Sequence, residues 1–193
     1  QHAITALIAG FLNENPDMTL QTIEGDSTFV KELLTDGKCD IAFLRSESSS
    51  VKEFNSIPYM IDYLTAVLPA THPLAKADNL PFEQLRGETF LLFPEHSFIN
   101  DLCIRECRNA GFEPHIAYTG NRGATLIDLV RNGAGITLMM HHSARQENDS
   151  SLAFIPVTPG IYSYISLNYA KEKPLSPQAE SFVRYVKAHK RDF

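Results

Sequence analysis

The 193-residue sequence predicts an α/β fold of two lobes, one of which is formed by both ends of the chain. Short apolar runs typical of buried strands alternate with segments whose apolar residues recur at helical spacing. Two such series follow each other, and two strands and a helix then end the chain. If this last part packs on the first series, the chain crosses between lobes twice and forms a two-strand hinge. We therefore expect lobe I at residues 1–68 plus 152–193, and lobe II at residues 69–151.

The first series contains two helices and two strands. Pro16 stops the first helical pattern, and Gly37 follows the second, where glycine commonly ends a helix. The second strand is nearly all apolar, as expected for a central parallel strand, so a βαβ crossover is predicted. The predicted elements are a helix over residues 3–12, a strand over 18–23, a helix from Asp26 or Ser27 to Leu34, and a strand over 40–44.

The second series repeats this alternation after a long apolar, β-branched stretch at residues 57–69. Ser176 and Pro177 then begin the last helix, with a capping residue followed by proline at the first helical position. The other predicted elements are strands over 88–93, 114–118, 136–140, 152–157 and 162–170, and helices over 98–110 and 124–131.

Composition excludes some classes of function. The formal net charge is −6, from 17 basic and 23 acidic side chains, which argues against a nucleic-acid-binding surface. The basic segment Lys187–Arg191 follows a predicted helix. Cations near a helix C-terminus interact favourably with the helix dipole, so this segment does not indicate nucleic-acid binding. No signal peptide or membrane-spanning run appears, and three cysteines form an odd, sparse set. We therefore expect reduced thiols, no membrane association and a cytoplasmic location.

No catalytic, nucleotide-binding or metal signature is present, so we predict neither an enzyme nor a cofactor or metal site. Gly133-x-Gly135 follows a helix rather than a strand and is interpreted as a helix-ending turn. Adjacent His141 and His142 point apart, which favours surface or capping histidines over metal ligands. Cys103 and Cys107 share one helix face; buried thiols are one interpretation and a redox pair is the other.

Polar residues at three predicted helix starts are candidate ligand contacts. Each segment follows a strand and opens a helix, where free backbone N–H groups and the positive end of the helix dipole favour an anion. Each segment alone also fits an ordinary helix cap. The carboxylate of Asp26 would repel an anion if it pointed inward. Arg45, at the end of a neighbouring strand, would face the same region. The three segments are Gly25–Thr28, Glu95–Phe98 and Asn121–Gly123.

Several short motifs follow one another along nearly the whole chain. They are Phe11-x-x-x-x-Pro16 before the strand at 18–23, Leu33-x-x-x-Gly37-x-x-Asp40-Ile-Ala-Phe43, His72-Pro-Leu-Ala75, Leu85-x-Gly87, Cys107-x-x-Ala110-Gly-Phe-x-Pro114, and Leu129-Val-x-x-Gly133-x-Gly135-Ile-x-Leu138. In combination and order they resemble the C-terminal effector-binding domain of LysR-type bacterial transcription regulators. Two departures stand out: the family's strand before the first helix is absent here, and Met140-His141 replaces a usual proline.

The resemblance implies a type 2 periplasmic-binding-protein fold with two Rossmann-like lobes. It also implies a homodimer or homotetramer, and DNA binding only through an N-terminal winged helix-turn-helix outside this sequence. A small, anionic effector, with a carboxylate and some apolar or aromatic character, is expected in the interlobe cleft. The pocket positions carried over are Ser27, Thr28, Arg45, His96, Ser97, Phe98 and Ile99, with Arg122 and Gly123 at the next helix start. The alternatives are an extracytoplasmic solute-binding protein of a transport system, and an enzyme on this fold.

Overall fold

The computed structural model describes residues 2–144 and 149–189, and its contacts divide the chain into two units. Unit 1 comprises Gln1–Ile61 and Ser163–Phe193, and unit 2 comprises Asp62–Tyr162. These bounds differ from the predicted lobe bounds, which fall after residues 68 and 151. The reason is β2 (Phe54–Pro69), which runs from unit 1 into unit 2 and whose residues 64–69 pair with strands of unit 2.

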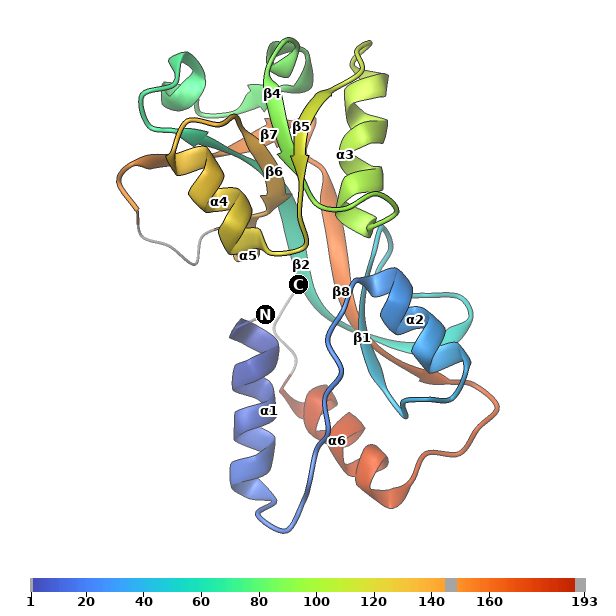
Figure 1. The fold of residues 1–193 in the computed structure, drawn as a ribbon. Coiled ribbons are helices and arrows are strands. Elements are labelled where there is room, and N and C mark those ends of the chain that lie inside the picture. The colour runs from blue at the N-terminus through green and yellow to red at the C-terminus, as the bar shows by residue number, and fades with distance from the viewer. Residues whose placement is uncertain (1, 145–148, 190–193) are drawn as a thin grey trace. The chain divides into compact units, whose positions relative to one another are not determined.

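Unit 1 combines a small sheet with three helices (Figure 1). Strand β1 (Ala42–Ser46) pairs antiparallel with β8 (Tyr162–Ala170), which lies beside β2. The helices are α1 (His2–Glu14), α2 (Ser27–Thr35) and α6 (Pro177–Ala188). Phe11 of α1 is fully buried and meets Phe182 of α6 edge to face, with ring centroids 5.0 Å apart. This contact joins the first and last helices of the chain.

Two predictions for unit 1 are wrong. Residues 18–23 form no strand: Met18 and Leu20 pack against the core, which explains the alternation, but no strand in the described ranges pairs with them. A strand requires a hydrogen-bonded partner as well as an alternating pattern. The predicted run at residues 40–44 overlaps β1, which covers Ala42–Ser46, but β1 pairs antiparallel with β8 instead of lying in a parallel sheet.

Unit 2 contains the parallel pair that the alternating pattern predicted. Strand β4 (Thr89–Leu92) pairs parallel with β5 (His115–Thr119) across the connecting helix α3 (Phe98–Asn109), and Phe90 forms a parallel bridge with Ile136. Strands β6 (Thr137–Met140) and β7 (Leu152–Thr158) pair antiparallel with β2. The remaining elements are η1 (Pro73–Lys76), β3 (Leu80–Pro81), η2 (Phe82–Leu85), α4 (Gly123–Arg131) and α5 (His141–Ala144).

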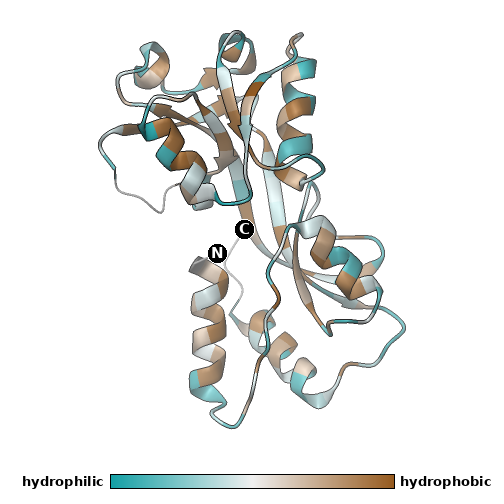
Figure 2. Ribbon diagram, in the orientation of Figure 1, coloured by the Kyte–Doolittle hydropathy of each residue, from teal (hydrophilic) through white to brown (hydrophobic). Residues whose placement is uncertain are grey.

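Side-chain alternation explains why three successive residues of β4, Phe90–Leu92, are all apolar. Phe90 and Leu92 of β4 pack into the core cluster that includes Leu102 of α3. Leu91, between them, packs with Leu126 of α4 in a different cluster. Successive strand residues face opposite sides, so both faces are covered. Brown and teal stretches accordingly alternate along α3 and α4 (Figure 2). None of the described helices is long and apolar enough to span a membrane.

Candidate functional site

The start of α2 in unit 1 is capped by Asp26. Its Oδ1 accepts a hydrogen bond from the backbone N–H of Thr28 at 2.9 Å. The carboxylate therefore satisfies one of the free N–H groups at the helix start. The hydroxyl of Thr28 is exposed and has no hydrogen bond within the described ranges. The predicted capping residue Asp26 is confirmed, and Thr28 presents an exposed hydroxyl beside it.

Ser27 and Arg45 are in direct contact. The Ser27 hydroxyl accepts a hydrogen bond from the backbone N–H of Arg45 at 2.9 Å. The guanidinium of Arg45 donates to the hydroxyl of Ser163, 2.6 Å away, and Ser163 is fully buried in β8. Because its side chain is tied to a buried strand residue, Arg45 is held in a fixed orientation at the end of β1. Ser163 was not predicted, since it lies far from Arg45 in sequence.

The start of α3 in unit 2 is closed by hydrogen bonds. Ser97 is the N-cap: its hydroxyl accepts from the backbone N–H of Asn100 at 3.3 Å and donates to the carbonyl of Pro94 at 2.7 Å. His96 precedes it with a φ of 65° and an exposed side chain. Phe98 and Ile99 are half-buried and pack against the core of unit 2. Ser97 therefore has a structural role, whereas Glu95 and His96 are the exposed residues of this segment.

Phe93 brings the two predicted helix starts of unit 2 together. Its carbonyl accepts a hydrogen bond of 2.8 Å from the side-chain amide of Asn100, which is 3% exposed. A Cβ on Gly123, the first residue of α4, would lie 3.7 Å from the Phe93 ring. Arg122 precedes Gly123 and is exposed, and its side chain has no hydrogen bond or ion pair in the described part of the chain. Asn100 was not predicted as a contact, because nothing in the sequence distinguishes it from other polar helix residues.

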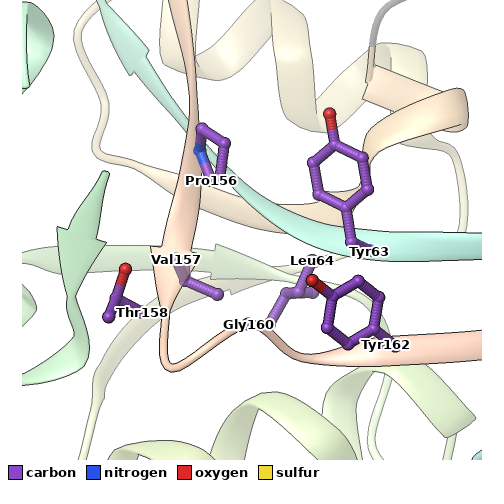
Figure 3. Close-up of a pocket in the computed structure, with 7 residues that line it drawn as sticks. All are labelled: Tyr63, Leu64, Pro156, Val157, Thr158, Gly160 and Tyr162. Atoms are coloured by element: carbon purple, nitrogen blue, oxygen red, sulfur yellow. The ribbon is translucent and has the colours of Figure 1, made fainter. Parts of the chain in front are cut away.

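A pocket of about 380 Å³ lies within unit 2 (Figure 3). Tyr63 and Tyr162 lie on one side of it, across from Pro156 and Thr158. The other lining residues are Leu64, Val157 and Gly160. No charged side chain lines this pocket, so it suits an apolar or aromatic group with a hydrogen-bonding edge. None of the predicted site residues lines it.

The two adjacent histidines are engaged within unit 2. His141 stacks on Tyr63 with ring centroids 4.4 Å apart. His142 donates its backbone N–H to Oδ1 of Asp62, and its Nδ1 lies 2.9 Å from the same oxygen. Within residues 2–144 and 149–189, no three His, Cys, Asp or Glu side chains are grouped so that they could hold a metal ion. These contacts give both histidines structural roles.

The cysteine pair of α3 is buried. Cys103 and Cys107 are both 0% exposed and belong to the core of unit 2. Burial, with smaller contributions from Glu113 and Glu106, raises the pKa of Cys107 to about 12. Burial likewise raises the pKa of Cys103 well above its usual range. A thiolate is the reactive form of cysteine, so these pKa values disfavour the redox interpretation.

Comparison with known proteins identifies the family. The family model described as the LysR substrate binding domain matches residues 1–191. The transcriptional dual regulator GltC of Bacillus subtilis is 25% identical over 184 residues, which cover 95% of this chain and 61% of GltC. The regulator TtuA of Agrobacterium vitis is 29% identical over 147 residues, which cover 74% of this chain and 47% of TtuA. The chain thus spans about three fifths or less of the length of these relatives.

Solved structures of the same class share the fold. The CcmR regulatory domain from Synechocystis in complex with 2-PG has a TM-score of 0.88 and 16% identity, covering 99% of this chain and 92% of that one. The QuiR effector-binding domain in complex with shikimate has a TM-score of 0.80 and 20% identity, covering 98% and 93%. The predicted α/β fold of the type 2 periplasmic-binding-protein class is therefore confirmed. Together with the family match, this establishes that the chain belongs to the LysR substrate-binding-domain family.

Proposed function

We propose that this chain is the effector-sensing part of a longer bacterial transcription regulator and that it binds a small anionic metabolite. The observation that carries the proposal is the pair of arginines beside helix starts. Arg45 is fixed through its guanidinium by Ser163, and Arg122 is exposed without a partner in the described ranges. A guanidinium beside free helix N–H groups suits a carboxylate or phosphate.

The proposed contacts separate into side chains that bind and side chains that position. Thr28, Arg45, Arg122 and His96 offer donors to the effector. Ser27 and Ser97 hold the backbone around them, because their hydroxyls already take part in internal hydrogen bonds. The remaining proposed positions, which supply apolar or close backbone contact, are Phe98, Ile99 and Gly123. The two complexes described above hold 2-PG and shikimate, which supports a small metabolite as the ligand class.

The proposed output is control of DNA binding by a segment outside this sequence. An effector changes such an equilibrium only if it binds two conformations of the protein with different affinity. Full-length CbnR complexed with its target DNA has a TM-score of 0.77 to this chain and 21% identity, covering 98% of this chain and 66% of CbnR. We infer a homodimer or homotetramer in the cytoplasm, in contact with DNA through the missing segment.

Binding without chemistry is the favoured activity. The relatives named above are transcription regulators, which also disfavours the alternative of an extracytoplasmic solute-binding protein. We therefore propose that the bound metabolite leaves the protein unchanged. Incubating the protein with its strongest ligand and analysing the mixture by mass spectrometry should show the intact ligand only. A converted product would contradict this proposal.

A thermal-shift screen tests the effector site. The panel contains small organic acids and phosphate esters, including shikimate and 2-PG. A ligand that binds the folded state raises the melting temperature with its concentration. We expect the shift given by the best ligand to shrink in Arg122→Gln and in Thr28→Val. Arg108→Gln is the matched control, because Arg108 is an exposed helix arginine of unit 2 that is paired with Glu113.

One result of this screen would contradict the proposed effector site. If Arg122→Gln and Thr28→Val both retain the full shift of the parent protein, the ligand binds elsewhere. The pocket lined by Tyr63 and Tyr162 is then the next place to test, with Tyr63→Leu and Tyr162→Leu.

A further inference from the structure

A second pocket, of about 350 Å³, lies within unit 1 beside the end of β8 and one face of α6. It shares no residue with the proposed effector contacts. Its lining combines an apolar part, which includes Tyr169 and Leu175, with a group of cationic side chains. The cationic residues are Lys171, Lys173, Arg184 and Lys187, and the acidic residue among the lining is Glu180.

The positive charge of this pocket is unusual for the molecule. The chain carries a formal net charge of −6, yet four cations and one carboxylate line this one concavity. Like charges close together raise the free energy of the folded state unless an opposite charge neutralises them. A concentration of positive charge in a concavity of an acidic protein therefore favours the binding of an anion.

The internal contacts of the pocket leave most of this charge uncompensated. The ammonium of Lys171 donates to the backbone carbonyl of Lys52. The side chains of Lys173, Arg184 and Lys187 have no hydrogen bond or ion pair within residues 2–144 and 149–189. Glu180 forms no direct ion pair there, and one carboxylate offsets at most one of the four positive charges. Three cations are therefore available to an incoming ligand.

Two of these cations, Arg184 and Lys187, lie on one face of α6 together with Glu180. Positions 180, 184 and 187 are spaced four and three residues apart, which places them along one face of α6. The opposite face is anchored in the core by Phe182, Val183 and Val186, each at most 5% exposed. Tyr169 and Leu175 pack against the same core and supply the apolar part of the pocket. Arg184 and Lys187 thus project from a helix that is anchored in the core.

We propose that this pocket binds a phosphorylated small molecule. A ligand with two or more negative charges matches three free cations better than a monocarboxylate does, and the guanidinium of Arg184 can form a bidentate contact with a phosphate group. The volume falls within the range of metabolite sites, and the apolar part can contact the organic portion of the ligand. The concave shape favours a small ligand over the extended backbone of a nucleic acid.

Titration with inorganic pyrophosphate, followed by isothermal calorimetry at low salt, tests this proposal. We expect saturable binding whose affinity decreases as salt is added. In the double variant Arg184→Gln/Lys187→Gln the affinity should decrease on the order of tenfold or more, because two charge-assisted contacts are lost. Lys38→Gln is the matched control in unit 1, because Lys38 is exposed and paired with Asp36. It should bind as the parent does.

Two outcomes would overturn the proposal. One is the absence of pyrophosphate binding, or binding that the double variant retains in full. The other outcome is that the parent protein binds a short DNA duplex tightly but does not bind pyrophosphate, and that the double variant no longer binds the duplex. This result would indicate a nucleic-acid surface. If the double variant does not fold, Lys173→Gln, in the segment before α6, provides the same comparison. Because the effector contacts are elsewhere, failure here leaves the proposed sensing function intact.

Discussion

The hydroxyl of Ser27 accepts a hydrogen bond from the backbone N–H of Arg45 at 2.9 Å, which joins the start of α2 to the end of β1. The acceptor capacity of Ser27 is therefore directed into the protein. The neighbouring Thr28 hydroxyl has no such partner in the described ranges and is exposed. Adjacent residues at one helix start thus have different roles: Ser27 stabilises the local structure, and Thr28 is available to a ligand.

This difference predicts that two conservative variants will differ in stability. Ser27→Ala leaves the Arg45 N–H without its acceptor and should lower the free energy of unfolding by about 1 kcal/mol. Thr28→Val removes a hydroxyl without a partner and should change it by less than about 0.5 kcal/mol. Urea unfolding followed by circular dichroism measures both. Equal destabilisation by the two variants would show that the Ser27 contact has no special importance.

The buried carboxylate of Asp62 predicts a larger effect in unit 2. Asp62 is 0% exposed, and its Oδ1 accepts from the backbone N–H groups of Tyr63 and His142. Asp62→Ala leaves these donors without their acceptor and should cost about 2–4 kcal/mol of unfolding free energy. Asp62→Asn keeps an oxygen and should cost less.

His142→Ala is the matched comparison for Asp62. This variant removes only the imidazole contact, whereas its backbone N–H remains bonded to Asp62, and the His142 side chain is 45% exposed. We expect a loss of about 1 kcal/mol or less. A loss equal to that of Asp62→Ala would mean that the imidazole, rather than the backbone donors, accounts for the stability.

The three thiols should react in a fixed order. Cys39 is partly exposed, whereas Cys103 and Cys107 are buried and burial raises the pKa of Cys107 to about 12. Only the thiolate is nucleophilic, so Ellman's reagent at pH 8 should modify Cys39 first and the buried pair only on unfolding. Cys39→Ser should abolish the fast phase. Rapid modification of Cys103 or Cys107 in the native protein would restore the redox interpretation.

The same pKa predicts how stability changes in alkali. The folded-state pKa of Cys107, about 12, lies above the unfolded value of about 8.5. Between these values the unfolded state releases a proton that the folded state keeps. The contribution to stability is thus complete below pH 8.5 and decreases as the pH rises towards 12. Urea midpoints should fall over this window, and less so in Cys107→Ala. Equal slopes for the two proteins would contradict this.

Asp149 should remain ionised in strong acid. Hydrogen bonds from the side chain and backbone of Ser151, and then from Arg131, lower the pKa of Asp149 to about 2. Because the folded pKa is depressed, its stabilising contribution is present above about pH 4 and is lost as the pH falls towards 2. Carboxyl ¹³C shifts should give a midpoint near 2 in the parent protein. The midpoint should move towards 4 in Ser151→Ala, and an unmoved midpoint would refute the assigned cause.

Local patterns predicted most of the helices and strands. The cap at Asp26, the caps at Ser97 and Ser176, and the helical spacing of residues 98–110 depend on near neighbours in sequence, and the structure confirms them. Pairing partners depend on distant residues. For this reason the alternation at residues 18–23 was interpreted wrongly as a strand, and the antiparallel partner of β1 was missed.

The candidate site was predictable at its helix starts but not in its supporting contacts. Ser163 accepts a hydrogen bond from Arg45 although the two residues are 118 positions apart in sequence. No motif near either residue predicts this contact. The tyrosine-lined pocket likewise combines residues from β2, β7 and β8. Such sites arise only when the strands assemble, so no local motif encodes them.

The most direct test of the sensing function is an amide chemical-shift map recorded while the protein is titrated with the strongest ligand of the organic-acid and phosphate-ester panel. If the helix starts bind the effector, the largest shifts will occur at Thr28, Arg45 and Gly123, and Arg122→Gln will reduce them. Saturating shifts confined to other residues, with these three amides unmoved, would contradict the proposed effector site.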